Sequence, residues 1–207
     1  MFSLNLPNKL TISRLALVLV FAFFAFPFPE YKIFSGEFFT GNYRAIVALV
    51  VYIVASITDA LDGHIARKNN LVTNFGKFLD PIADKLLVTS ALLALMTSSN
   101  VYLWATLIIL AREFIVSAIR MMSASKGVVI PAGIMGKLKM VFQTIAIITL
   151  LVGGIVPVKW ELAGINLSNL VYGLGNFILL IAVVLTIVSG VQYVYNSRHL
   201  LSANENN

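Results

Sequence analysis

The sequence predicts an all-α membrane protein in which six transmembrane helices form one bundle around a polar cavity. Its 207 residues are 59% hydrophobic and only 12% charged, which is not the composition of a soluble globular domain. Several apolar runs reach about 18 residues, the length at which a helix can cross a bilayer. Four of the nine acidic residues nevertheless gather between positions 59 and 84. Helices satisfy their own backbone hydrogen bonds in lipid, and the acidic stretch indicates where the bundle is polar.

Polar turns and loops containing Pro and Gly separate the six spans. A short interfacial segment, residues 1–8, precedes the first span. That span carries no signal-peptide cleavage pattern, so we expect it to be retained. We find no internal repeat and therefore predict one domain over residues 1–207, with a disordered polar tail from about residue 197. The spans are predicted at about 10–26, 43–68, 75–96, 102–123, 135–156 and 169–195, with loops at 27–42, 97–100, 124–134 and 157–168.

The distribution of basic residues predicts the orientation in the membrane. Six spans place both termini on one side, and twelve of the 15 basic residues share that half; Lys32, Arg44 and Lys159 do not. Because Lys and Arg mark the cytoplasmic side, we expect both termini and a polar active-site cavity to face the cytoplasm. The net charge of +6 could also suggest nucleic acid. In a membrane protein it more often indicates orientation and anionic substrates.

Four aspartates lie along single faces of two consecutive predicted helices. Asp59 and Asp62 are three residues apart, and Asp80 and Asp84 are four apart. A polar turn between the helices could bring all four carboxylates together. Each aspartate at the centre of a membrane helix costs roughly 2.5–3.5 kcal/mol, and their mutual repulsion requires protonation or bound cations. Since the chain has no Cys and two His, the carboxylates favour Mg²⁺, Mn²⁺ or Ca²⁺, and a site that handles phosphate.

Two small residues share the face of the first aspartate pair. Gly63 and Ala66 would let a ligand approach the helix backbone, and a glycine inside a helix costs about 0.5–1 kcal/mol relative to alanine. The alternative is that they only allow two helices to pack closely. The neighbouring aspartates and Arg67 favour the ligand.

The pattern D-x-x-D-G-x-x-A-R, eight residues, then G-x-x-x-D-x-x-x-D resembles the signature of the CDP-alcohol phosphotransferases. Its fixed positions are Asp59, Asp62, Gly63, Ala66, Arg67, Gly76, Asp80 and Asp84. The resemblance implies transfer of a phosphatidyl group from CDP-diacylglycerol to an alcohol, with release of CMP. It also implies two Mg²⁺ or Mn²⁺ ions held by the four aspartates, Asp84 as general base, and a homodimer. Residues implied to bind CDP-diacylglycerol are Asp59, Gly63, Ala66, Arg67 and Gly76.

The start of the first span, P-N-K-L-T-I-S-R, also resembles this family, in which such residues line the nucleotide site. Asn8, Thr11 and Arg14 recur every three residues, within about 120° of the helix circumference. The resemblance adds Asn8 and Thr11 to the CDP-diacylglycerol site. The alternative is a helix cap at Asn8 and an arginine that extends to the membrane surface.

A basic cluster is predicted on the fourth and fifth spans. Arg112 and Arg120 are eight residues apart on one helix face, while Glu113 is expected to point elsewhere. Lys137 and Lys139 open the next span. Arginine forks suit phosphate, and lysine adds a point charge, so these four residues are candidates for binding an acceptor phosphate. Alternatively, the lysines are interfacial anchors and Arg112 pairs with an aspartate of the site.

Further stretches resemble bacterial members of the family that use sn-glycerol 3-phosphate as acceptor and form phosphatidylglycerol phosphate. They include S-I-T-D-A-L-D-G, A-R-E at 111–113 and G-K-L-K at 136–139. This resemblance implies a multi-pass protein of the bacterial cytoplasmic membrane. Inositol phosphate, serine and phosphatidylglycerol remain alternative acceptors. Outside this class, buried acids could also form the relay of an ion transporter.

Overall fold

The computed structural model describes the backbone of residues 6–26, 42–69, 74–97, 101–125, 133–157, 159–162 and 164–202. Within these ranges, side chains are described except at residues 6–11, 59–81, 83–84, 125, 162 and 199–202. The described chain forms six helices: α1 (Leu6–Ala25), α3 (Asn42–Asn69), α4 (Asn74–Thr97), α5 (Leu103–Ser125), α6 (Ile134–Gly153) and α7 (Leu167–Ser202). Strands β1 (Glu161–Leu162) and β2 (Ile165–Asn166) pair antiparallel between α6 and α7.

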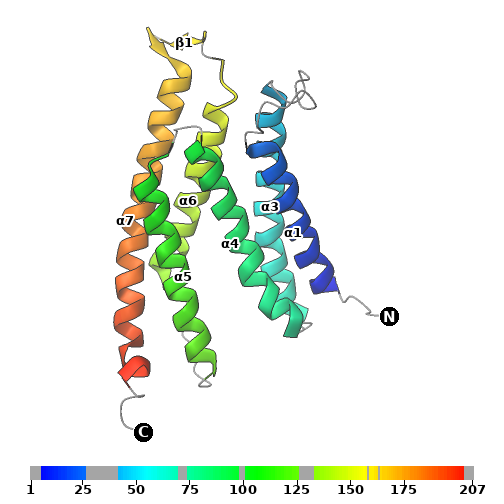
Figure 1. The fold of residues 1–207 in the computed structure, drawn as a ribbon, viewed down its shortest axis with the longest axis vertical. Coiled ribbons are helices and arrows are strands. Elements are labelled where there is room, and N and C mark those ends of the chain that lie inside the picture. The colour runs from blue at the N-terminus through cyan, green and yellow to red at the C-terminus, as the bar shows by residue number, and fades with distance from the viewer. Residues whose placement is uncertain are drawn as a thin grey trace.

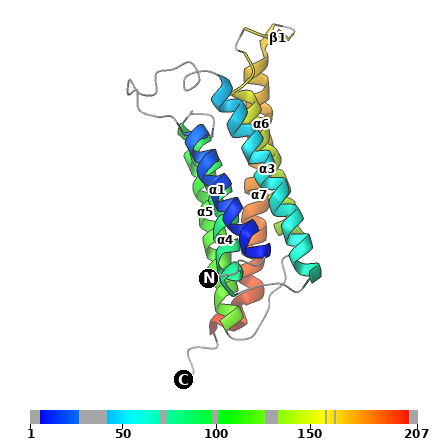
Figure 2. The same ribbon diagram turned by 90° about the vertical axis from the view of Figure 1, so that its right-hand side faces the viewer.

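Successive helices run in opposite directions through the bundle (Figures 1 and 2). The first turn of α1 and the last turn of α7 therefore lie toward the same end, at the bottom of Figure 1. The end of α3 and the start of α4 also lie there. The β1–β2 hairpin lies at the opposite end of the bundle.

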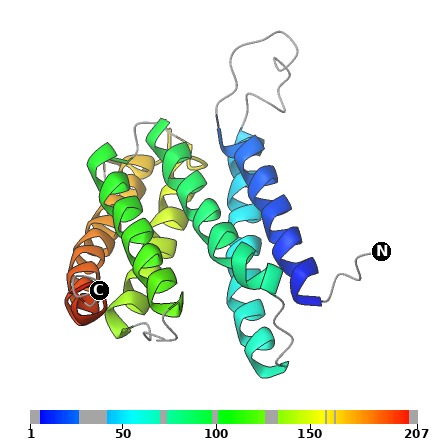
Figure 3. The same cartoon turned by 60° about the horizontal axis from the view of Figure 1, so that its bottom comes forward.

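The helices form two groups that meet along α4 (Figure 3). Helices α1, α3 and α4 pack together on one side, and α5, α6 and α7 on the other. Contacts of α3 with α6, and of α4 with α5 and α6, join the groups. Fully buried Phe21 and Tyr52 belong to the apolar core, with ring centroids 5.7 Å apart. The same apolar core continues through both groups, because Leu92 on α4, Ile109 on α5 and Ile147 on α6 belong to it as well.

Long apolar segments and outward-facing hydrophobic side chains fit a membrane environment. Of the described helices, α6 and the Leu167–Arg198 part of α7 are long and apolar enough to cross a bilayer. Phe177, Val184 and Val191, seven residues apart along α7, are all exposed. A continuous apolar face of this kind is rare on a monomeric soluble protein, and lipid would cover it.

The all-α prediction with six helices is confirmed, and three details are corrected. The predicted loop at 157–168 contains the hairpin, whose turn includes Gly164 at φ +79°, a conformation that favours glycine. The predicted interfacial segment overlaps α1, which already begins at Leu6. The tail predicted to be disordered from about residue 197 is helical to Ser202. Ser197 is buried, and its hydroxyl donates to the Tyr193 carbonyl at 2.7 Å within the helix.

Helices α6 and α7 approach closely at Gly175, which gives a test of the packing. A Cβ there would lie 2.7 Å from Cγ of the fully buried Leu150. We expect Gly175→Ala to lower the free energy of unfolding by about 1–3 kcal/mol through overpacking. Thermal unfolding in detergent, followed by intrinsic fluorescence, measures the change.

Gly173→Ala is the matched control, because a Cβ at Gly173 meets no atom within 4 Å. It should leave stability unchanged or raise it slightly, since alanine favours the helix. Equal losses in the two variants would contradict the close α6–α7 packing.

Candidate active site

A cavity of about 790 Å³ lies between the two helix groups and is lined by residues from all six described helices. Buried apolar side chains such as Tyr52 and Ile109 form part of its wall. The remaining wall is strongly polar, with charged or amide side chains that include Arg14, Lys85, Arg112, Glu113, Arg120, Lys137, Lys139 and Gln143. Six basic side chains and one carboxylate in this group make the cavity suitable for an anionic ligand.

The cavity lies beside the two helix segments that carry the predicted aspartates. Ser56 lines it three residues before Asp59 on α3, and Lys85 lines it directly after Asp84 on α4. The helix backbone of both segments is described and lies toward the end of the bundle where α6 begins (Figure 1). The side chains of Asp59, Asp62, Asp80 and Asp84 lie outside the described residues, as do those of Gly63, Ala66, Arg67 and Gly76. Their convergence on a metal site stays a prediction.

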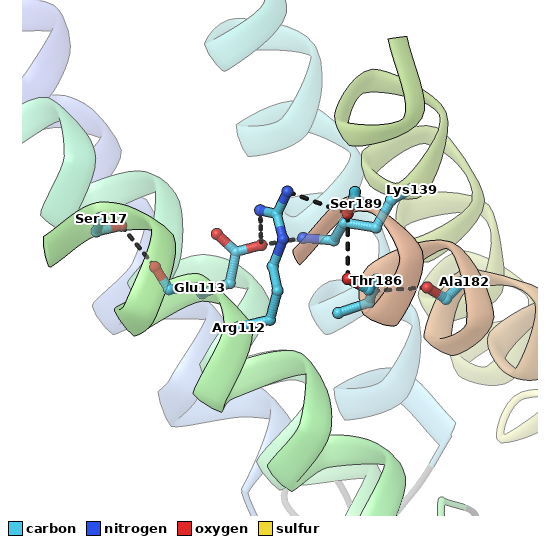
Figure 4. Close-up of polar contacts among 7 residues, drawn as sticks. All are labelled: Arg112, Glu113, Ser117, Lys139, Ala182, Thr186 and Ser189. Atoms are coloured by element: carbon cyan, nitrogen blue, oxygen red, sulfur yellow. Dashed lines mark hydrogen bonds and ion pairs between the residues drawn. The ribbon is translucent and has the colours of Figure 1, made fainter. Parts of the chain in front are cut away.

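An ion-pair cluster inside the bundle joins α5 to α6 (Figure 4). The Glu113 carboxylate contacts Lys139 Nζ and also lies 3.6 Å from Arg112 Nη1. The side chains of Lys139, Arg112 and Glu113 are only 5%, 15% and 21% exposed. The expectation that Glu113 points away from Arg112 is therefore wrong. Adjacent helical residues start about 100° apart, but long side chains can bend toward the same buried partner.

Helix α7 holds the Arg112 guanidinium from the other side. Arg112 Nη2 donates to Ser189 Oγ at 3.1 Å, and that hydroxyl donates to the Thr186 carbonyl at 3.1 Å. A Cβ at Gly190 would lie 3.1 Å from Arg112 Cγ, so glycine makes room for the arginine stem. Arg112 Nε is buried without a hydrogen-bond partner in the described part of the chain. The arginine is thus positioned by contacts within α5 and with α7, and its Nε donor is unused among the described residues.

The structure brings all four predicted acceptor-phosphate residues to this one cavity. Arg120 is exposed and lies over the Tyr193 ring, 5.9 Å from its centroid. Lys137 is also exposed, whereas Lys139 is buried against Glu113. Among these residues, Arg112 and Lys139 are held in place, and Arg120 and Lys137 lie where solvent reaches them.

The cavity also contains residues that sequence reasoning missed or assigned differently. Arg14 is 4% exposed and lines the cavity, so it does not extend to the membrane surface as one alternative supposed. The side chains of Asn8 and Thr11 lie outside the described residues. Gln143 carried a signal that could have been used, because it follows Lys139 by four residues on the same helix face. The approach of Ser189 to Arg112 had no signal, since it depends on how α5 and α7 pack.

No group of three or more His, Asp or Glu side chains that could hold a metal occurs among the described residues. That search does not reach the four aspartates. Their donor chemistry, four hard carboxylate oxygen ligands without Cys, still fits Mg²⁺ or Mn²⁺.

Residues 4–188 match the family described as CDP-alcohol phosphatidyltransferase. The chain therefore belongs to the CDP-alcohol phosphatidyltransferase family, and the resemblance expected from the signature is confirmed. It is 39% identical to the CDP-diacylglycerol–glycerol-3-phosphate 3-phosphatidyltransferase of Bacillus subtilis (strain 168), over 91% of this chain and 93% of the relative. A protein of the same name from Rickettsia typhi (strain Wilmington) is 40% identical over 91% and 94%. The "Probable phosphatidylglycerophosphate synthase" of Mycobacterium tuberculosis (strain H37Rv) is 36% identical over 92% and 80%.

The Glu113–Lys139 contact predicts that substitutions of these two residues have coupled effects on stability. Glu113→Gln leaves the buried Lys139 ammonium without its carboxylate. We expect a loss of about 1–3 kcal/mol in unfolding free energy, because a buried ammonium that loses a charged partner is less well compensated. The loss in the double variant Glu113→Gln, Lys139→Met should be smaller than the sum of the losses in the two single variants. Thermal unfolding in detergent measures all three. The exposed Lys137→Met is the control and should change little. Strictly additive losses would show that the pair does not stabilise the bundle.

Proposed function

We propose that this protein transfers the phosphatidyl group of CDP-diacylglycerol to sn-glycerol 3-phosphate, giving phosphatidylglycerol phosphate and CMP. The observation that carries this proposal is the near full-length similarity to relatives named for that reaction, at 39% identity over 91% of the chain. The cation-rich cavity beside the signature segments supports it independently.

The charge of the cavity supports a phosphorylated acceptor. Four predicted acceptor residues contribute positive charge to it, and Glu113 offsets only part of that charge. An acceptor without a phosphate group, such as serine, would not require so many cations. Arg112, held by Ser189 with Nε unused, presents a preorganised donor to a phosphate oxygen. Arg120, Lys137 and Lys139 complete this acceptor-phosphate site.

The signature segments are the proposed site for the diphosphate of CDP-diacylglycerol. Asp59, Asp62, Asp80 and Asp84 would hold two Mg²⁺ or Mn²⁺ ions. When bound, these ions supply Lewis-acid stabilisation and charge neutralisation at the diphosphate. Gly63, Ala66 and Gly76 would let the substrate approach the backbone, and Arg67, with Asn8 and Thr11, would contact its polar part. The diacylglycerol chains would stay in lipid.

The chemical step needs a base beside the acceptor hydroxyl. Asp84 is proposed to take the hydroxyl proton on a carboxylate oxygen while the hydroxyl oxygen attacks the phosphorus that carries diacylglycerol. A new P–O bond forms to the acceptor, and the P–O bond to CMP breaks. Lys85 directly follows Asp84 on α4 and lines the cavity, which supports a position of Asp84 close to the proposed acceptor site.

We further propose a multi-pass protein of the bacterial cytoplasmic membrane, with termini and active site on the cytoplasmic side. The distribution of basic residues, twelve against three, supports this orientation. The cavity lies toward the bundle end that holds the first turn of α1 and the last turn of α7, so a cytoplasmic site and cytoplasmic ends are compatible. A homodimer is the proposed assembly, on the basis of the family resemblance alone.

The proposed acceptor is tested by giving the purified protein CDP-diacylglycerol, Mg²⁺ or Mn²⁺, and one acceptor at a time. We expect CMP release with sn-glycerol 3-phosphate and little with serine, inositol phosphate or phosphatidylglycerol. Release with serine but not glycerol 3-phosphate would overturn the acceptor assignment. Ion movement across liposomes without any CMP release would favour a transporter.

Asp84→Asn tests the proposed base. Asparagine keeps the shape and one oxygen ligand but cannot accept the proton, so we expect turnover to fall by about 10²–10⁴-fold. Metal binding, followed by titration with Mn²⁺, should be partly retained. Glu161→Gln, in the exposed strand β1, is the control and should retain full activity. Near-normal activity of Asp84→Asn would exclude this role.

A further inference from the structure

The amide oxygen of one buried cavity residue has no hydrogen-bond partner in the described part of the chain. Gln143 is 3% exposed, lines the cavity from α6, and its Oε1 atom has no partner among the residues that the structure describes. A buried acceptor left unpaired costs about 1–3 kcal/mol, so such atoms in native proteins call for an explanation. The Tyr193 hydroxyl, on α7, lines the same cavity and is buried and unpartnered in the described chain as well. Two unpaired polar groups that line one cavity indicate that the cavity binds a polar ligand.

The position of Gln143 relates it to the proposed phosphate site. Gln143 follows Lys139 by four residues on α6, so it lies about 6 Å further along the same helix face. Lys139 is in turn tied to Glu113 and stands near Arg112 at the cation cluster. The rise of one helical turn matches the span of a three-carbon polyol phosphate. Beyond Gln143, the fully buried Ala146 and Ile147 leave no polar continuation along this face of the helix.

We infer that Gln143 recognises the acceptor through its middle hydroxyl group, which donates a hydrogen bond to the amide oxygen. This inference rests on the proposed function, because it takes sn-glycerol 3-phosphate as the acceptor. That molecule has two free hydroxyls, and the terminal one is the less hindered nucleophile. The middle hydroxyl is therefore the group that remains for recognition. Gln143 is a specificity residue that touches the substrate without entering the chemical step.

The physical basis of the selectivity is the buried amide itself. Water can satisfy Gln143 when no acceptor is bound, and a bound acceptor displaces that water. An acceptor with the middle hydroxyl replaces the lost hydrogen bond, whereas one without it leaves the amide unpaired. A site built around a hydroxyl in this way discriminates strongly against analogues that lack it.

The test compares sn-glycerol 3-phosphate with 3-hydroxypropyl phosphate, which keeps the phosphate and the terminal hydroxyl but lacks the middle one. CMP release by the purified full-length protein gives kcat/KM for each acceptor. We expect the wild-type protein to favour glycerol 3-phosphate by about 10-fold or more. Gln143→Met, which has nearly the same shape, should lose most of this preference. The kcat/KM of this variant for 3-hydroxypropyl phosphate should differ from that of the wild-type protein by less than about threefold, because the variant has no buried amide that the analogue could leave unpaired.

Gln192→Met is the matched control. Gln192 is the chain's other glutamine and also lines the cavity, from α7, but it is exposed and lies near Gly133, where α6 begins, so solvent can satisfy its amide whatever acceptor is bound. It should keep the wild-type preference. The thermal unfolding temperature of Gln143→Met should be unchanged or higher, since an apolar isostere removes an unsatisfied buried group. A lost preference in this variant then reflects recognition and not misfolding.

Two results would overturn the inference while leaving the proposed function intact. One is a wild-type protein that uses both acceptors equally well, a measurement that requires no variant. The other is a Gln143→Met protein that keeps the full preference. A wild-type protein that releases no CMP with glycerol 3-phosphate would instead overturn the proposed function, and this inference with it.

Discussion

Charge compensation inside an apolar bundle is the constraint on which this structure depends. Glu113 on α5 meets Lys139 on α6, and Arg112 between them reaches Ser189 on α7, so one cluster holds three helices together. Each of these charges would be costly alone in a low-dielectric interior. Because they compensate one another only in part, the cavity keeps an excess of positive charge. The interaction that stabilises the bundle therefore also prepares it to receive an anion.

In the proposed function, the two groups of helices contribute different parts of the site. Helices α5 and α6 provide four of the six cavity cations and the buried amide of Gln143. Helices α3 and α4 carry the signature segments with their aspartates, and α4 adds Lys85 to the cavity wall. Helix α1 contributes Arg14 from the other wall. A reaction between a phosphorylated acceptor and a diphosphate donor requires two anions to meet. The proposed acceptor and donor sites would bring them together by sharing one cavity.

Much of this arrangement could be predicted from local sequence. Apolar runs of membrane-spanning length predicted the helices, and Asn69–Asn74 marked the turn between α3 and α4. The basic residues of A-R-E and G-K-L-K, predicted to form one cluster, line one cavity. Prediction failed where the surroundings of a side chain depend on how the helices pack. Glu113 was expected to point away from Arg112, and Ser197 was placed in a disordered tail although it is buried.

The sequence by itself determined the helical class, the approximate spans and membership of the family, because hydrophobic length and fixed motif spacing are properties of consecutive residues. Only the tertiary structure decided that Lys139 is buried against Glu113 and that Ser189 holds Arg112. It also decided that Gln143 lines the cavity with its Oε1 atom unpaired among the described residues. These features depend on the rotation and separation of packed helices. Both are set by contacts such as Gly175 against Leu150, between residues 25 positions apart in the chain.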